Sequence, residues 1–180
     1  MPSQEILLQY PKRIKKKAAE IKALFFDVDG VLTDGRIIYD NNGNETKNFH
    51  VKDGYIISHL KKAGIVVGII TGRNSKAVAD RAAELQLDFC HQGVLDKYVV
   101  FKKLAEEYGI QEGEIAYLGD DINDLKVLTS CGLSACPRDA PSYIKERTDL
   151  VTEAKGGRGA LREVADLILD AKGILCKILK

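Results

Sequence analysis

Apolar residues in this chain come in short continuous runs, separated by longer stretches in which they recur every three or four positions. The runs at 23–28, 65–71, 88–93, 114–120, 132–137 and 150–152 predict buried strands, because a strand covered on both faces has no polar side. Segments 55–64, 74–87, 96–110, 122–132 and 140–147 predict helices, and 156–173 predicts a loop followed by a helix. Short connections between strands and helices favour right-handed βαβ units. We therefore expect an α/β fold with a doubly wound parallel sheet.

One segment departs from this alternation. Two short strand-like runs, 36–39 and 45–49, flank the sequence DNNGN. An Asn-Gly pair between such runs is a strong signal for a β-hairpin. We expect a small hairpin inserted after the first strand.

The N-terminal segment is basic. Residues 12–22 carry six Lys or Arg and one Glu. A solvated helix is the expected structure, and binding to a phosphate-rich partner is the alternative. We divide the chain into a basic extension, residues 1–20, and a single domain, residues 21–180.

Composition and charge narrow the class of protein. The 180 residues are 45% hydrophobic and 29% charged, as in ordinary globular domains. Lys and Arg (27) nearly balance Asp and Glu (26), whereas nucleic-acid binders usually carry a basic excess, so we expect no nucleic-acid partner. No apolar run approaches the ~18 residues of a membrane span, and no signal peptide is apparent. The four cysteines have no zinc-site spacing and lie among apolar residues, which favours buried, reduced thiols. Together these features favour a cytoplasmic protein.

Charged and hydroxyl side chains follow four of the predicted strands. They are Asp27 and Asp29, Thr71, Lys97, and Asp120. The carboxyl ends of parallel strands meet at one edge of the sheet, where such folds bind ligands. Carboxylates packed together repel one another unless a cation neutralises them, and Mg²⁺ prefers oxygen ligands. The sequence therefore predicts a magnesium site at this edge.

The ordered set DVDGVLTDG, TGR, a later lysine and GDDIND resembles the motifs of the haloacid dehalogenase (HAD) superfamily of phosphotransferases. The resemblance implies a Rossmann-like fold in which Asp27 is the nucleophile that forms an aspartyl-phosphate. It implies that Asp29 protonates the leaving alkoxide and later activates water. Mg²⁺ would be held by the carboxylates of Asp27 and Asp120 and by the backbone carbonyl of Asp29. Thr71 and Lys97 would bind the transferring phosphoryl group.

Two further acids of GDDIND are expected to support these groups. Asp124 lies four residues beyond Asp120, on the same face of the following helix, and would orient Lys97 or a metal-bound water. Asp121 is either a supporting group of the same kind or only the carboxylate that starts a helix. Asp29 can protonate a leaving oxygen, whereas a halide leaves without a proton. The presence of this acid therefore favours phosphoryl transfer over dehalogenation.

A narrower resemblance covers nearly the whole chain after residue 20. DVDGVLTDGRIIYD, FHVKDG, TGRNS, QGVLDK and GGRGALRE together resemble the 3-deoxy-D-manno-octulosonate 8-phosphate phosphatase family. This implies hydrolysis of a phosphorylated eight-carbon ulosonic acid in lipopolysaccharide biosynthesis. A phosphatase for a nine-carbon ulosonate 9-phosphate and a non-catalytic oligomerising module are the alternatives. The expected substrate-binding residues are Asp29, His50, Val51, Lys52, Asp53, Gly54, Arg73, Arg81, Lys97, Asn123 and Arg158.

The short stretch between Gly30 and Thr71 leaves no room for a cap domain over the site. A site open to water weakens electrostatic catalysis. The resemblance implies that a homo-oligomer, a tetramer, solves this, with the hairpin and C-terminal tail of neighbours covering the entrance. Gly156, Gly157 and Gly159 predict a tail loop too flexible to pack on its own core, which would carry Arg158 to a neighbour's site. A plain linker to the closing helix is the alternative.

Overall fold

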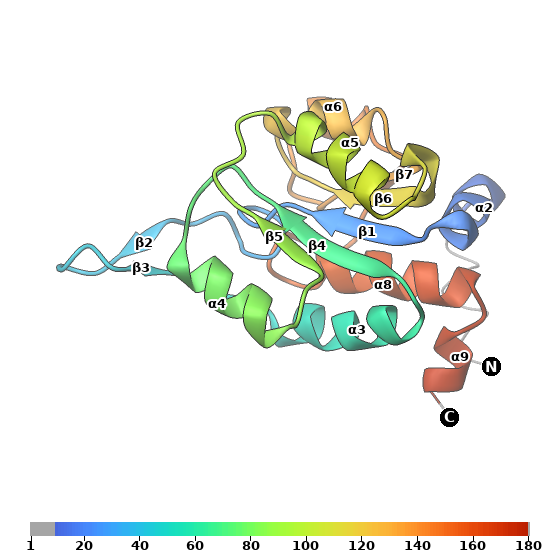
Figure 1. The fold of residues 1–180 in the computed structure, drawn as a ribbon, viewed down its shortest axis with the longest axis horizontal. Coiled ribbons are helices and arrows are strands. Elements are labelled where there is room, and N and C mark those ends of the chain that lie inside the picture. The colour runs from blue at the N-terminus through green and yellow to red at the C-terminus, as the bar shows by residue number, and fades with distance from the viewer. Residues whose placement is uncertain (1–9, 180) are drawn as a thin grey trace.

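The computed structural model describes residues 10–179 and confirms the doubly wound α/β fold. Six parallel strands form one sheet in the order β5–β4–β1–β6–β7–β8 (Figure 1). Their bounds are β1 (Ala23–Phe26), β4 (Val66–Ile70), β5 (Phe89–His91), β6 (Ile115–Leu118), β7 (Leu133–Cys136) and β8 (Leu150–Val151). The strand order reverses at β1, which lies between β4 and β6. Such a switch point opens a crevice at the carboxyl end of the central strand, where ligands bind.

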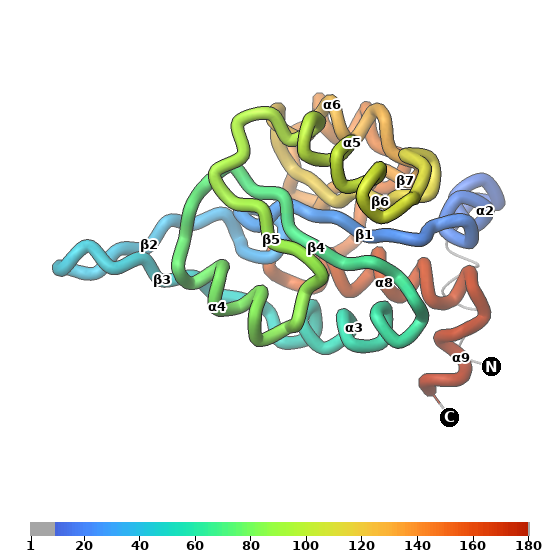
Figure 2. Tube along the Cα trace, in the orientation of Figure 1, coloured from blue at the N-terminus to red at the C-terminus, as the bar shows by residue number. Residues whose placement is uncertain are grey.

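Helices cover both faces of the sheet (Figures 1 and 2). One face is covered by α2 (Lys12–Glu20), α3 (Val51–Lys62), α4 (Lys76–Glu84), α8 (Ala160–Ala171) and α9 (Leu175–Ile178). The other is covered by α5 (Lys97–Glu107), α6 (Leu125–Leu128) and α7 (Ser142–Lys145). Two short 3₁₀ turns, η1 (Glu112–Glu114) and η2 (Ile122–Asp124), flank β6. Helix α3 begins four residues before the predicted start, because Gly54, a poor helix former, hides its first turn in the sequence.

The central strand shows why its sequence is a continuous apolar run. Leu24 and Phe26 pack into the core on one face of the sheet, and Ala23 and Phe25 pack into the core on the other. All four side chains are fully buried. Successive side chains of a strand point to opposite faces, so a strand covered on both sides needs an apolar residue at every position.

The predicted hairpin is present as β2 (Ile38–Tyr39) and β3 (Glu45–Thr46), paired antiparallel. In Figure 1 it projects from one end of the molecule, beside α4. Asp40 closes its turn by accepting hydrogen bonds from the backbone N–H groups of Asn42 and Asn44. Between β1 and β4 the described chain forms only this hairpin and α3, so the site carries no cap domain.

Within the basic N-terminal segment, α2 lies on the domain. Its Ile14 and Ala18 are buried in the same core as β1. On its other side Arg13 and Lys17 form ion pairs with Asp149, at 2.7 and 2.6 Å. The helix is thus amphipathic, with solvated lysines on one face only. The first nine residues of the predicted extension lie outside the described residues.

The glycine-rich loop before α8 packs on the domain's own core, so the prediction of a loop too flexible to do so was wrong. The N–H of Gly156 donates to Asp139 at 3.0 Å, and the N–H of Gly157 donates to the carbonyl of Val31 at 2.8 Å. A Cβ atom on Gly156 would lie 1.9 Å from the carbonyl oxygen of Gly30. The glycines therefore serve a close approach of two backbones rather than mobility.

Within residues 10–179 no helix combines the length and hydropathy that crossing a membrane requires. The four cysteines are free thiols; Cys136 is buried, and Cys90, Cys131 and Cys176 are half-buried. Full burial of all four, as the sequence suggested, is thus not observed.

We predict that Gly156→Ala lowers the free energy of unfolding by about 1–3 kcal/mol, the usual cost of overpacking. Gly113→Ala is the matched control, because a Cβ there meets nothing within 4 Å. Urea denaturation of both variants checks this. Equal midpoints for the two variants would contradict the tight packing of the loop.

Candidate active site

The chain makes a tight turn directly after β1. The N–H groups of Val31, Leu32 and Thr33 all donate to the carbonyl of Val28. Gly30 enters this turn with a φ of +86°, in the left-handed region. A Cβ atom on Gly30 would also lie 2.1 Å from Asp120 Oδ2. Glycine at this position therefore permits both the turn and the approach of the acid that follows β6.

The ends of β1, β4 and β6 enclose a cavity of about 160 Å³. The structure brings most of the predicted catalytic and metal-binding residues to it. Its lining is Asp27, Asp29, Thr71, Gly72, Arg73, Asp120, Asp121 and Asn123. The side chain of Asp27 and that of Thr71 are buried, while Asp29 is half-buried. Carboxylates, a hydroxyl and a guanidinium thus meet at the switch point of the sheet.

Lys97 lies behind this cavity, at the start of α5, between two carboxylates. Its Nζ is 3.0 Å from Asp27 Oδ2 and 2.7 Å from Asp124 Oδ1, and all three side chains are buried. Burial disfavours the lysine charge, but the carboxylates of Asp124 and Asp27 outweigh it and hold the pKa of Lys97 above its usual value. The lysine is therefore charged and fixed beside Asp27.

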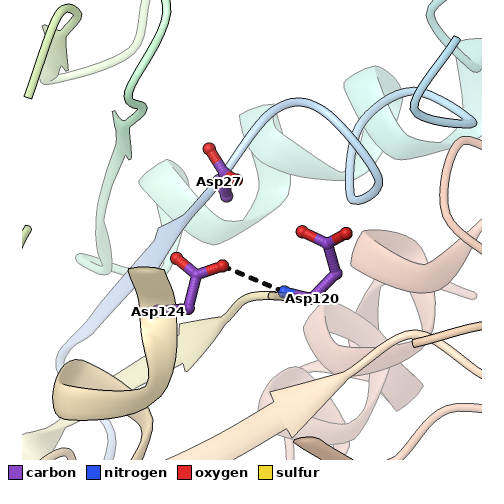
Figure 3. Close-up of side chains that lie close together, drawn as sticks. All are labelled: Asp27, Asp120 and Asp124. Atoms are coloured by element: carbon purple, nitrogen blue, oxygen red, sulfur yellow. Dashed lines mark hydrogen bonds between the residues drawn. The ribbon is translucent and has the colours of Figure 1, made fainter. Parts of the chain in front are cut away.

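Asp124 is fully occupied by protein donors. Besides Lys97, its Oδ1 accepts from the hydroxyl of Tyr117 at 2.7 Å, a contact that the sequence analysis missed. Its Oδ2 accepts the N–H group of Asp120 at 3.1 Å (Figure 3). The same oxygen accepts the N–H group of Asp121 at 3.3 Å. Asp124 thus orients both the lysine and the backbone that carries Asp120. It does so from the 3₁₀ turn η2, not from the α-helix we expected.

Asp121 starts η2. Its carboxylate accepts the N–H of Ile122 at 2.7 Å, and its side chain is otherwise exposed. This contact is that of a helix-start carboxylate, and Asp121 also lines the cavity.

Three carboxylates of the site lie close enough to share a cation. Ligand atoms of Asp27, Asp120 and Asp124 all lie within 4.8 Å of one another. Asp27 Oδ1 and Asp120 Oδ1 are buried and have no hydrogen-bond partner among the described residues. Burial and the negative charge of Asp124 raise the pKa of Asp27 to about 6, against the lowering effect of Lys97. Burial and the charges of Asp27, Asp124 and Asp121 raise that of Asp120 to about 8.

The carboxylates of Asp27 and Asp120 fit a divalent cation. Two buried oxygen atoms without partners, on carboxylates that repel each other, are what a Mg²⁺ ion would satisfy. Asp124 fits less well as a ligand, because its oxygen atoms already accept from Lys97, Tyr117 and two backbone N–H groups. The residues present therefore favour Asp27 and Asp120 as the side-chain ligands.

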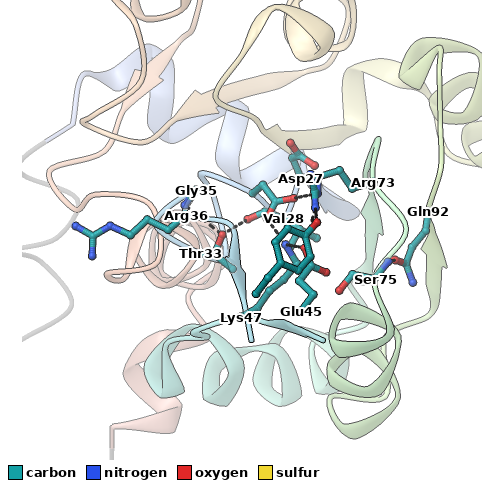
Figure 4. A network of polar contacts seen from close by, with 12 residues as sticks. Asp27, Val28, Thr33, Gly35, Arg36, Glu45, Lys47, Arg73, Ser75 and Gln92 are labelled. Carbon is teal, nitrogen blue, oxygen red and sulfur yellow. Dashed lines mark hydrogen bonds and ion pairs between the residues drawn. The ribbon is translucent and has the colours of Figure 1, made fainter. Parts of the chain in front are cut away.

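Asp29 lies on another side of the cavity, among cations. Its Oδ1 is 2.5 Å from Lys47 Nζ, and its Oδ2 is 3.6 Å from Arg73 Nε. Glu45 binds both cations, accepting from Arg73 at 2.9 Å and lying 3.3 Å from Lys47 (Figure 4). Lys47 and Glu45 come from the hairpin, and neither was predicted from the sequence as a site residue.

The remaining predicted substrate-binding residues lie outside this cavity. His50 and Arg158 line a second cavity of about 260 Å³, together with Arg36. Val51, Gly54 and Arg81 line a third, of about 340 Å³. Lys52, predicted to precede α3, lies exposed in its first turn.

Asp53 and Arg81 have local structural partners. The buried carboxylate of Asp53 accepts the N–H groups of Gly159 and Arg162, at 3.2 and 2.8 Å, and so ties α3 to the start of α8. Arg81 pairs with Glu84 at 2.8 Å, and a Cβ atom on Gly54 would lie 2.2 Å from its Nη2. Arg81 is therefore packed against α3 rather than free in solvent.

Comparison with known proteins agrees with this geometry. The model of the haloacid dehalogenase-like hydrolases matches residues 86–162. The 3-deoxy-D-manno-octulosonate 8-phosphate phosphatase KdsC of Escherichia coli strain K12 is 46% identical over 159 residues, 88% of this chain and 85% of that protein. KdsC of Haemophilus influenzae is 41% identical over 160 residues, 89% of each chain. This chain belongs to the 3-deoxy-D-manno-octulosonate 8-phosphate phosphatase family.

A solved member of this phosphatase family has the same fold. It is the Moraxella catarrhalis 3-deoxy-D-manno-octulosonate 8-phosphate phosphatase, crystallised with magnesium, phosphate and the free ulosonate, 3-deoxy-D-manno-octulosonate (KDO). Its TM-score is 0.92 at 39% identity, covering 94% of this chain and 98% of that one. The resemblance to this family and to the HAD superfamily, first drawn from short motifs, is thereby confirmed across most of the chain.

The raised pKa values of Asp27 and Asp120 predict that stabilisation of the fold by Mg²⁺ depends on pH. Without a cation, protonation of Asp27 and Asp120 stabilises the fold, and this stability is lost as the pH rises through about 6 and 8. A bound Mg²⁺ offsets the repulsion between the ionised groups and adds stability by mass action. We therefore expect Mg²⁺ to raise Tm, and to raise it more at about pH 8.5 than at about pH 5.5.

Thermal denaturation at both pH values, with Mg²⁺ or with EDTA, checks this expectation. Asp120→Asn removes one of the two repelling charges and one ligand, so its Tm should gain less from Mg²⁺. Asp80→Asn, on the exposed face of α4, is the control. A Mg²⁺ effect that is the same at both pH values would contradict the assignment of the cation to these carboxylates.

Proposed function

We propose that this chain is a Mg²⁺-dependent phosphatase that hydrolyses 3-deoxy-D-manno-octulosonate 8-phosphate to the free ulosonate and phosphate. The observation that carries the proposal is the buried Lys97, which holds one oxygen of Asp27 and leaves the other without a partner at the cavity. Its substrate is taken from the family, of which the Escherichia coli and Haemophilus influenzae members share 46% and 41% identity with the chain.

Asp27 is the nucleophile of the proposed reaction. Lys97 pairs with Oδ2 and favours the ionised form of Asp27, which is the form that can attack phosphorus. A bond forms between Asp27 and phosphorus while the bond from phosphorus to the sugar oxygen breaks. The charge of Lys97 also attracts the phosphoryl oxygens as they approach the carboxylate.

Asp29 is the general acid and then the general base of the proposed reaction. Protonated Asp29 gives its proton to the sugar oxygen as that oxygen leaves. The resulting carboxylate then takes a proton from a water molecule, which attacks phosphorus and breaks the bond to Asp27. Thr71, whose hydroxyl lines the cavity, donates to a phosphoryl oxygen, and Asn123 lies at the cavity rim as a further contact.

The metal site belongs to the same proposal. The carboxylates of Asp27 and Asp120 and the backbone carbonyl of Asp29 are the groups that would hold Mg²⁺. When bound, the ion neutralises charge on the phosphate group and helps to align it with the nucleophile. Asp124 positions Lys97 and the backbone of Asp120.

Basic residues, most of them outside the catalytic cavity, would recognise the sugar. The protein would be a homotetramer and would be located in the cytoplasm. His50 and Arg158 line a cavity together with Arg36 and Asp34, and would bind the carboxylate of the sugar there. The hairpin that projects from the domain exposes Ile37, Ile38 and Tyr39, which a neighbouring subunit would cover. Lys52 and Arg81, outside the cavity, and Arg73, in its lining, complete the basic set, with Val51, Asp53 and Gly54 as further contacts in the first turn of α3. The free thiols fit a reducing compartment.

We predict that Asp27→Asn abolishes phosphate release from 3-deoxy-D-manno-octulosonate 8-phosphate and leaves Tm close to that of the wild type. An amide cannot attack phosphorus, and removing a buried charge with a raised pKa is not costly to the fold. Steady-state assays with Mg²⁺ and with excess EDTA, alongside thermal denaturation, check both parts.

Asp80→Asn again serves as the exposed control. Turnover of Asp27→Asn within about tenfold of the wild type would contradict the nucleophile assignment, since covalent and acid–base groups contribute more than this. A higher kcat/KM for a nine-carbon ulosonate 9-phosphate would overturn the choice of substrate while leaving the reaction class in place.

A further inference from the structure

A buried lysine at the base of the hairpin has no role in the chemistry described so far. The side chain of Lys47 is only 1% exposed. Its Nζ lies 2.5 Å from Asp29 Oδ1 and 3.3 Å from Glu45 Oε1. Lysine is almost never buried unless it is paired, because removing its charge from water is costly.

The hairpin geometry brings Lys47 to Asp29. Glu45 is in β3, and Lys47 lies two residues further along, where the extended chain places both side chains on the same face. Glu45 binds Lys47 on one side and Arg73 on the other, and Arg73 also donates to the hydroxyl of Tyr39 in β2. The two cations that reach Asp29 are thus held by residues of the hairpin (Figure 4).

Stability alone does not account for this arrangement. A buried ion pair is often no more stabilising than apolar residues of the same volume, because both charges lose their hydration. Yet the pair involves the carboxyl group that the proposed function makes the proton donor. Lys47 and Arg73 approach different oxygens of that group, so its position and rotation are both restricted.

We propose that Lys47 is a positioning residue for Asp29, an inference that rests on the proposed function. The contact between its Nζ and Oδ1 of Asp29 aims the carboxyl group at the leaving oxygen. As Asp29 gives its proton to that oxygen, the developing carboxylate is stabilised by Lys47, which keeps its own proton throughout. The hairpin then completes the catalytic site of its own subunit, in addition to any contact between subunits.

Aryl phosphates isolate this role, because they carry no carboxylate that Lys47 could bind. Phenyl phosphate has a poor leaving group that needs a proton, whereas p-nitrophenyl phosphate has a good one that does not. We expect Lys47→Met to lower kcat/KM about tenfold or more for phenyl phosphate and much less for p-nitrophenyl phosphate. Lys47→Gln should show the same selectivity, and Lys47→Arg should recover part of the loss. Lys76→Met, an exposed lysine paired with Asp80, is the matched control.

A double-mutant cycle with Asp29→Asn completes the test. If Lys47 acts through Asp29, adding Lys47→Met to Asp29→Asn causes no further loss of kcat/KM for phenyl phosphate. Equal losses for the two aryl phosphates, or additive losses in the cycle, would overturn the inference. Wild-type turnover of 3-deoxy-D-manno-octulosonate 8-phosphate tests the proposed function separately, since the comparison of variants uses only aryl phosphates.

Discussion

The buried ion pair between Lys97 and two aspartates is the interaction on which the site depends. A charge inside a protein is tolerated only when its partners are close and well placed, and Lys97 has carboxylate oxygens at 3.0 and 2.7 Å. Those partners come from two adjacent strands: Asp27 follows β1, and Asp124 lies in the 3₁₀ turn after β6. The sheet order that places β1 beside β6 is therefore also what places the lysine beside the nucleophile. The remaining acids are arranged around this fixed pair.

Close backbone packing around the site maintains that arrangement. Gly30 leaves room for Asp120, and Gly156 leaves room for the turn that contains Gly30. The loop before α8 thus supports the turn that carries the catalytic acids, and Asp53 ties the same region to α3. The hairpin contributes from the opposite side through Lys47, so elements far apart in the sequence meet at one small cavity. A site of this kind needs no cap domain to fix its acids, although enclosure of the substrate requires something further.

The sequence predicted most of the fold, because the relevant signals are local. Continuous apolar runs such as Leu24–Phe26 mark strands covered on both faces, and short motifs at strand ends mark the catalytic acids. Contacts between distant segments were harder to predict. Lys47 is an ordinary residue of a short strand in the sequence, and only the direction of the hairpin brings it to Asp29. The glycines at 156–159 were misread because glycine permits flexibility and close packing alike, and only the neighbouring backbone distinguishes the two. Tyr117 lies in an apolar run that predicts a buried strand, but the run does not predict the hydrogen bond from the Tyr117 hydroxyl to Asp124.

In the proposed mechanism the carboxylate held by Lys97 becomes covalently phosphorylated during turnover. Acid-quenching the enzyme during steady-state hydrolysis, reducing it with borohydride and mapping its peptides by mass spectrometry tests this directly, because reduction converts an aspartyl-phosphate into homoserine. Reduction is expected at position 27 alone, dependent on both substrate and Mg²⁺. Reduction at position 29 or 120 instead, or an unmodified Asp27 under conditions where phosphate is being released, would contradict it.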